Sequence, residues 1–263
     1  MLKTFKEIIQ YRHALWLLIG RDLANRYKGS VMGVFWLVLQ PLLMVAVYTF
    51  VFSVILKVRM AGTDNSYLYA FNLIVAMMPF FAFQDAVTAA THSLFANSAL
   101  LQKSTLPPVL FPLVPALSTL LTEVLALMVI ITLAGFLLDD LFLSVLFLPV
   151  LVMIRLFLSI AASYFISVLA VFIPDIRQAI GLILTMVLFL TPIFYPVTSV
   201  PENFRVFNDY NPFYHLLEGY RTVILKGELP DCGVYWVALF ALLSTFLGMW
   251  FFQKTINRAK DFV

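Results

Sequence analysis

Long runs of uncharged apolar residues are the feature that most constrains what this chain can fold into. Hydrophobic residues make up 62% of its 263 positions and charged residues only 12%, and the mean hydropathy is +0.97. A helix needs about 20 apolar residues to cross a hydrocarbon core about 30 Å thick. The composition lies outside the ordinary range of soluble domains, and it predicts an all-α polytopic membrane protein.

Six runs are long enough to be transmembrane helices. They cover residues 31–56, 67–90, 109–138, 141–172, 178–195 and 234–252. Only Asp139 and Asp140 separate the third run from the fourth, so we expect these two helices to be neighbours. Six crossings place both termini on one side of the membrane. The whole chain, residues 1–263, is treated as a single transmembrane domain.

The distribution of lysine and arginine predicts which side holds the termini. With cytoplasmic termini, eleven of the 17 basic residues lie in the cytoplasm, five lie outside, and Arg155 lies within a span. The five outside are Lys57, Arg59, Arg205, Arg221 and Lys226. Cytoplasmic segments carry an excess of basic residues, so we expect both termini in the cytoplasm. No basic stripe outside the membrane flanks is large enough to suggest nucleic-acid binding.

Residues 1–30 combine basic and apolar positions. Six Lys or Arg residues are interleaved with apolar residues that recur mostly three or four positions apart, which places the apolar ones on one face of a helix. Such a helix is expected to lie on the membrane surface and to contact membrane lipids. The alternative is a plain basic flank that precedes the first span.

The segment between the fifth and sixth spans, residues 196–226, is aromatic but interrupted by proline and asparagine. It is too broken to cross the membrane and too apolar for an ordinary loop. Non-helical backbone at membrane depth needs cover from protein or a water-filled path, so we expect an outer gate here. The candidate gate residues are Phe194, Tyr195, Pro196, Phe204, Phe207 and Phe213.

Aromatic residues make up 16% of the chain. Aromatic rings can stack on the flat apolar faces of sugars, and Tyr48 and Phe83 are candidates for lining a conduit in this way. The alternative is that most of these rings contact lipid or form belts at the membrane interface.

Three ionisable residues lie within the expected spans: Asp85, Glu123 and Arg155. Asp85 is close enough to the interface to be solvated. A charge at mid-bilayer costs a few kcal/mol and usually faces a partner or water. At about 1.5 Å per residue, Glu123 and Arg155 lie within about one turn in depth on neighbouring helices, so we predict that they pair. The pair would lock the two helices together, or it would serve as a proton or ion relay.

Signatures of enzymatic chemistry are missing. The chain has no Gly-Lys dipeptide and hence no phosphate-binding P-loop, so ATP-driven work would need a partner protein. It also lacks HExxH and GxSxG motifs, and its three histidines are scattered over separate elements. The single cysteine excludes an internal disulfide. We expect no enzymatic activity, no metal and no cofactor in this chain.

Several blocks occur together in a characteristic order. They are Arg-Asp-Leu at 21–23, Arg-Tyr-Lys-Gly-Ser at 26–30, Leu-Gln-Pro-Leu-Leu at 39–43, residues 97–103, Asp-Ile at 175–176, Thr-Pro-Ile-Phe-Tyr-Pro at 191–196, Val-Pro at 200–201 and Asn-Pro-Phe at 211–213. In this order they resemble the permease subunits of ABC-2 type transporters that export bacterial lipid-linked polysaccharides, and most of all the O-antigen permeases.

The resemblance implies an N-terminal interface helix, six spans, and a cytoplasmic coupling helix that docks on an ATPase. The coupling helix would lie within residues 95–104, and the re-entrant gate helices would cover about 202–209 and 212–226. The residues expected to take part in coupling are Arg21, Asp22, Asn97, Leu101 and Lys103.

The implied function is the membrane subunit of an ATP-driven exporter in the bacterial inner membrane. It would move a lipid-linked, O-antigen-like polysaccharide from the cytoplasm to the outer face. We expect a homodimer bound to two copies of an ATPase, which carries the ATP and Mg²⁺. The alternatives are a teichoic-acid or capsule exporter of the same family, a small-molecule ABC-2 exporter, and a membrane-embedded glycolipid transferase.

Overall fold

The computed structural model describes residues 2–26, 28–36, 39, 42–43, 46–47, 50–55, 66–103, 106–137 and 142–262. Within these ranges the chain is helical and contains no strand. The first expected span, residues 31–56, lies only partly within them, and the candidate conduit residue Tyr48 lies outside them.

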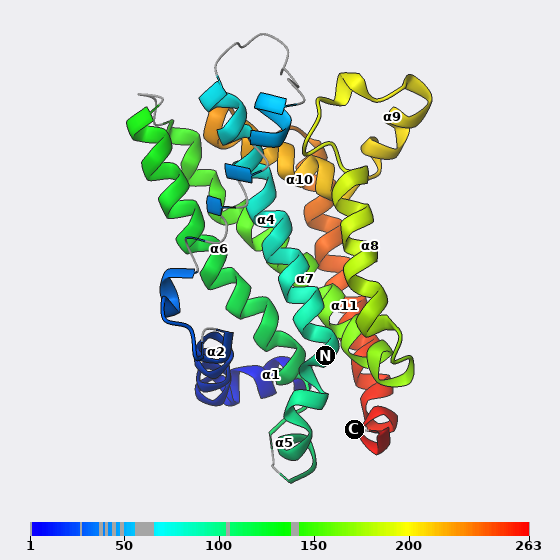
Figure 1. Cartoon of the computed structure of the whole chain (residues 1–263). Coiled ribbons are helices and arrows are strands. Elements are labelled where there is room, and N and C mark those ends of the chain that lie inside the picture. The colour runs from blue at the N-terminus through cyan, green and yellow to red at the C-terminus, as the bar shows by residue number, and fades with distance from the viewer. Residues whose placement is uncertain are drawn as a thin grey trace.

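Four long helices run side by side to form the bundle (Figure 1). They are α4 (Ser66–Ser93), α6 (Leu110–Leu137), α7 (Leu148–Phe172) and α11 (Gly233–Ala259). Among the described residues, these four are long and apolar enough to cross a membrane. The fourth span, expected at 141–172, corresponds to the apolar helical stretch Leu143–Phe172, in which the 3-10 turn η4 (Leu143–Phe147) precedes α7.

The fifth expected span is only partly helical. It was predicted for residues 178–195, but α8 (Ile176–Leu190) ends five residues earlier and has 15 residues. A 15-residue helix is about 22 Å long, which is shorter than the hydrocarbon core. The helix ends here because Pro192 disfavours helical backbone at the preceding residue, and Thr191 accordingly has φ −85° and ψ 131°.

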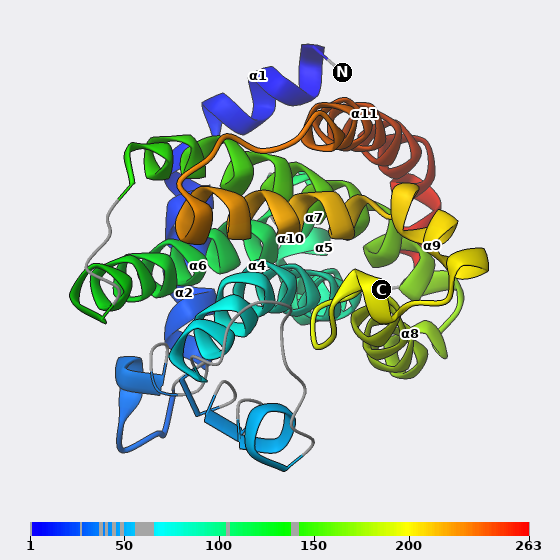
Figure 2. The same ribbon diagram turned by 90° about the horizontal axis from the view of Figure 1, so that it is seen from above.

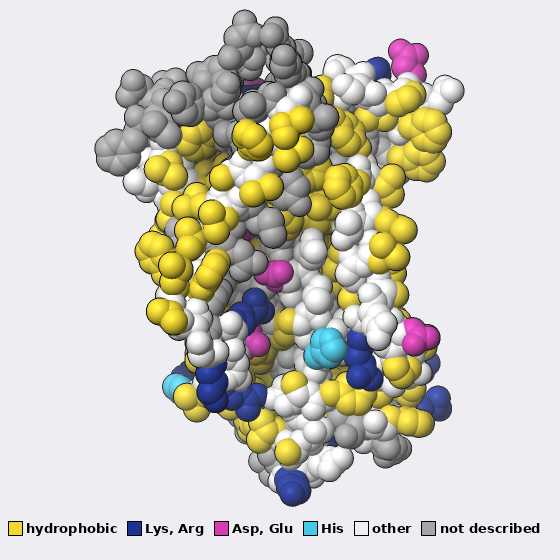
Figure 3. Space-filling view, in the orientation of Figure 1, with side chains coloured by type: hydrophobic (Ala, Val, Ile, Leu, Met, Phe, Trp, Pro, Cys, Tyr) yellow, Lys and Arg dark blue, Asp and Glu magenta, His cyan; other side chains and the backbone are white. Residues whose placement is uncertain are grey.

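The N-terminal segment forms two helices rather than the single helix expected for residues 1–30. Figures 1 and 2 show that α1 (Leu2–Gln10) and α2 (Arg12–Arg26) lie across the bundle axis at one end. The inner face of α2 buries Leu15, Leu18 and Ile19, while Trp16 and Leu17 are exposed. Both chain termini lie at this end (Figure 1), as do most of the Lys and Arg side chains on the face drawn in Figure 3.

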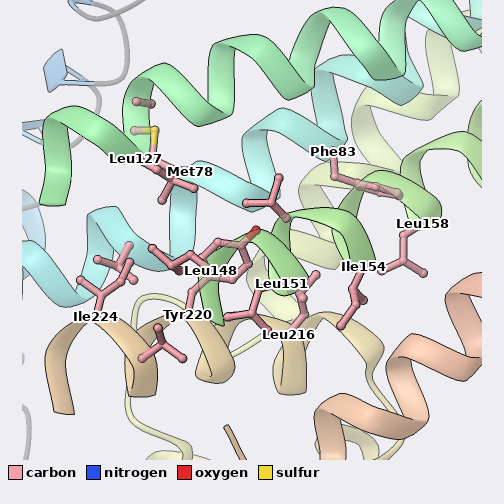
Figure 4. Packing of buried hydrophobic residues seen from close by; sticks show 14 of the residues in the cluster. Met78, Phe83, Leu127, Leu148, Leu151, Ile154, Leu158, Leu216, Tyr220 and Ile224 are labelled. Atoms are coloured by element: carbon pink, nitrogen blue, oxygen red, sulfur yellow. The ribbon is translucent and has the colours of Figure 1, made fainter. Parts of the chain in front are cut away.

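The opposite end is covered by short helices that follow α8. They are α9 (Glu202–Asp209) and α10 (Pro212–Arg221), and α10 continues into the π-helical turn η6 (Thr222–Lys226). Seen from above, α10 lies across the bundle (Figure 2). Its buried face packs into the largest apolar cluster, which also contains residues of α4, α6, α7, α8 and α11 (Figure 4).

Small residues bring α7 and α11 close together. A Cβ added to Gly248 of α11 would lie 2.8 Å from the carbonyl oxygen of Ala161 in α7. The Thr245 hydroxyl donates a 2.8 Å hydrogen bond to the carbonyl of Phe157. In a membrane, such backbone approach and interhelical hydrogen bonding take over the role that apolar burial has in water.

Candidate functional site

Glu123 of α6 and Arg155 of α7 meet inside the bundle. Arg155 donates through Nε to Oε2 of Glu123 at 2.8 Å and also through Nη2 to the same oxygen. Its Nη1 reaches the hydroxyls of Thr119 and Ser159, each at 3.3 Å. Both charged side chains are fully buried. The charges are therefore compensated within the protein, as a buried ion pair requires.

Tyr220 of α10 is a third residue that contacts this ion pair. Its hydroxyl donates to Oε1 of Glu123 at 2.9 Å, and the side chain is completely buried. Figure 4 shows Tyr220 pointing from α10 into the apolar side chains of the bundle. Sequence reasoning missed this residue because a tyrosine between two spans gives no sign that it reaches a carboxylate 97 positions away.

The candidate gate residues fall into two environments. Phe204 and Phe207 are exposed on α9, with ring centroids 6.2 Å apart. By contrast, Phe194 is 1% exposed. Phe213 packs edge-on against Phe83, with centroids 4.6 Å apart. The gate residues therefore do not form one continuous surface within a single chain.

The residues next to Phe194 are held by local contacts. The Tyr195 hydroxyl donates to the carbonyl of Phe189 at 2.8 Å, and Pro196 is half-buried just before the 3-10 turn η5 (Val197–Ser199). The candidate conduit residue Phe83 is 8% exposed. In the single chain, the Phe83 side chain therefore packs in the interior of the bundle and does not line an open path.

The expected coupling residues lie at the end of the bundle that holds the termini. The segment 95–104 contains the 3-10 turn η3 (Phe95–Asn97) and the helix α5 (Ser98–Lys103), which projects from this end (Figure 1). Arg21 of α2 donates to the side-chain oxygen of Asn97. The structure thus joins the two segments that were expected to contact an ATPase.

The other coupling residues have distinct positions. Leu101 is buried in the cluster that contains the inner face of α2, whereas Lys103 is exposed. Asp22 accepts a hydrogen bond from Arg26, one turn further along α2, at 3.1 Å. Among the charged coupling candidates, Arg21 and Lys103 are therefore exposed, and Asp22 is half-buried.

A further contact at this end was not expected. The guanidinium of Arg177, at the start of α8, lies 4.0 Å from the ring centroid of Phe95. It also donates to the carbonyl of Ala170 in α7. Such cation–π contacts are attractive. The coupling segment therefore touches the N-terminal end of α8 as well as α2.

Across the described ranges, no group of three or more His, Cys, Asp or Glu side chains is placed to hold a metal ion. Long apolar helices joined by buried polar contacts instead define a multi-pass helical membrane protein. The chain belongs to the ABC-2 type transporter family, whose model matches residues 13–225.

Three known proteins are similar to this chain over most of its length. The O-antigen export system permease protein RfbA of Myxococcus xanthus is 27% identical over 88% of this chain and 87% of its own. The protein of the same name from Klebsiella pneumoniae is 25% identical over 90% of both chains. The polysialic acid transport protein KpsM of Escherichia coli is 22% identical over 88% of this chain and 89% of its own.

Proposed function

We propose that this chain is the membrane-spanning subunit of an ATP-driven exporter that moves a lipid-linked, O-antigen-like polysaccharide across the bacterial inner membrane. The observation that carries the proposal is the similarity to O-antigen export permeases over about nine-tenths of both chains. If this chain shared only one domain with these permeases, the similarity would cover only part of their length. The near-complete overlap instead supports the same kind of subunit.

The geometry supports an exporter that a partner drives from one end. The bond between Arg21 and Asn97 ties α2 to the coupling segment, and Arg177 connects that segment to α8. At its other end, α8 leads into the expected gate. A push on the coupling segment would therefore act on α2 and α8 together.

The assembly we propose is a homodimer of this chain with two ATPase subunits, which would supply ATP and Mg²⁺. Both termini and α5 would face the cytoplasm, and α9 and α10 would form the outer gate, dipping back into the membrane from outside. The accumulation of basic side chains at the end with the termini (Figure 3) supports this orientation.

Reconstitution tests this function. The chain is co-expressed with an ABC-type ATPase of a polysaccharide exporter, purified, and placed in lipid nanodiscs. We expect a stable complex whose ATP hydrolysis rises on addition of a lipid-linked O-antigen-type glycan and not on addition of the lipid carrier alone. Failure to form a complex with any ATPase would contradict the proposal.

A capsule-type glycan is the second candidate cargo, because the chain also resembles a polysialic acid transport protein over 88% of its length. The same assay with an acidic, lipid-linked capsule glycan separates the two. Stimulation by the acidic glycan alone would favour capsule export.

A further inference from the structure

Residues 191–194, which follow α8, form a non-helical segment inside the protein, here named the buried break. Thr191, Ile193 and Phe194 are each no more than 1% exposed. Backbone groups outside a helix have no regular hydrogen-bond partners, and each unsatisfied group in an apolar medium costs several kcal/mol. The break therefore needs donors from elsewhere in the chain.

Arg221, the last residue of α10, supplies most of these donors. Nη2 donates to the carbonyl of Ile193 at 2.8 Å, and Nη1 donates to the carbonyl of Pro192 at 3.3 Å. Nε donates to the carbonyl of Asn72 in α4 at 3.2 Å, and Nη1 also reaches Glu218 at 2.5 Å. Arg221 is 4% exposed. One guanidinium thus joins α4, α10 and the buried break.

Two further side chains hold the two ends of the break. The Tyr69 hydroxyl of α4 donates to the carbonyl of Phe194 at 3.2 Å. Asn211 donates through Nδ2 to the Thr191 hydroxyl at 2.9 Å, while its Oδ1 caps the first turn of α10. Every residue of the break is therefore bonded to a side chain of α4 or of the α10 segment.

The sequence analysis counted Arg221 among the basic residues on the outer side and gave no sign that its side chain is buried, as the structure shows it to be. An exposed arginine would add little to stability. A buried one is costly unless all its contacts are kept. Its planar group spreads five N–H donors over a wide fork that reaches carbonyls on separate elements, whereas the ammonium of lysine has three donors on a single atom.

We propose that Arg221 is a positioning residue of the export path that acts on the buried break. This proposal rests on the function proposed above. Arg221 holds the buried break against α4 and α10 in the closed outer end. For the gate to open, the outer end of α8 has to move away from α4 and α10. This movement requires the carbonyls of Pro192 and Ile193 to break their hydrogen bonds to the Arg221 guanidinium. The gate is thus held shut by hydrogen bonds to backbone carbonyls, in addition to aromatic packing.

Hydrogen exchange of the full chain in lipid nanodiscs tests this role without any transport. The Arg221→Lys substitution keeps the charge but loses the multiple carbonyl contacts. We expect amides of residues 186–195 to exchange about tenfold faster, corresponding to the loss of roughly one charge-assisted hydrogen bond.

The matched control is Arg205→Lys. Arg205 also donates to two carbonyls, those of Val200 and Thr198, but both lie just before its own helix, so exchange in 186–195 should stay unchanged.

Export of surface glycan by cells that carry the same variants is the second readout. We expect Arg221→Lys to change export at least several-fold relative to the unaltered protein. Unchanged exchange in Arg221→Lys would overturn the proposal. So would an Arg221→Lys protein that fails to accumulate while Arg205→Lys does, because Arg221 would then be needed for folding alone. If the unaltered protein exports no glycan, the proposed function fails, whereas the exchange result still decides whether Arg221 holds the break.

Discussion

Arg155 donates a 2.8 Å hydrogen bond through Nε to Oε2 of Glu123, across the contact between α6 and α7. Removing one partner leaves the other charge buried and uncompensated, which typically costs about 3–5 kcal/mol. We therefore expect Arg155→Met alone to lower the unfolding temperature strongly. The Glu123→Gln, Arg155→Met double variant should recover most of the loss. Thermal unfolding in detergent measures both.

The same double variant separates the two roles that the pair could have. If the pair only locks the helices together, the double variant folds and exports glycan. A well-folded double variant without export would instead indicate a proton or ion relay.

Tyr220 contributes one hydrogen bond to the Glu123 carboxylate. Tyr220→Phe removes the hydroxyl and keeps the ring, so we expect a loss of about 1.5–3 kcal/mol, the usual range for a hydrogen bond to a charged group. Tyr235→Phe is the control because that ring is 59% exposed on α11. Equal unfolding temperatures for the two variants would contradict the contact.

The bond between Arg21 and Asn97 predicts a coupling defect. In the complex with the ATPase, we expect Arg21→Ala and Asn97→Ala each to reduce the glycan-stimulated part of ATP hydrolysis. Combined, they should do little more harm than either alone, because each already removes the shared contact. Arg12→Ala, an exposed arginine at the start of the same helix, serves as the control. Additive effects of the two substitutions would argue against a shared contact.

Gly248 predicts a packing defect between α7 and α11. Gly248→Val would push side-chain atoms into the Ala161 carbonyl and the Phe165 ring, and we expect a loss of about 1–3 kcal/mol from overpacking. Gly181→Ala is the matched control, because an added Cβ there meets nothing within 4 Å. It should be neutral or slightly stabilising. Unfolding temperatures that fall equally for both variants would contradict this assignment.

The helical fold could be read from the chain because apolar runs of spanning length allow little else in a membrane. The end of α8 was misplaced by five residues. Hydropathy continues through residues 191–195, and only the backbone geometry reveals where the helix stops. The single interface helix likewise proved to be two helices, since periodicity alone does not show a change of direction.

The pairing of Glu123 with Arg155 could be predicted because each charge is costly alone and both lie at similar depth on neighbouring helices. Tyr220 and Arg221 could not be found in this way. They lie between two expected spans, and nothing in their local sequence distinguishes a residue that faces water from one that reaches into the bundle.

The sequence by itself determined that this is a helical membrane protein, and it carries the ordered motifs that resemble ABC-2 permeases. Hydropathy and motif order are properties of the linear chain. Only the tertiary structure decided which polar groups meet inside it. A buried donor must find its acceptor wherever the fold brings one, and for Arg221 the acceptors lie up to 149 positions away in the chain.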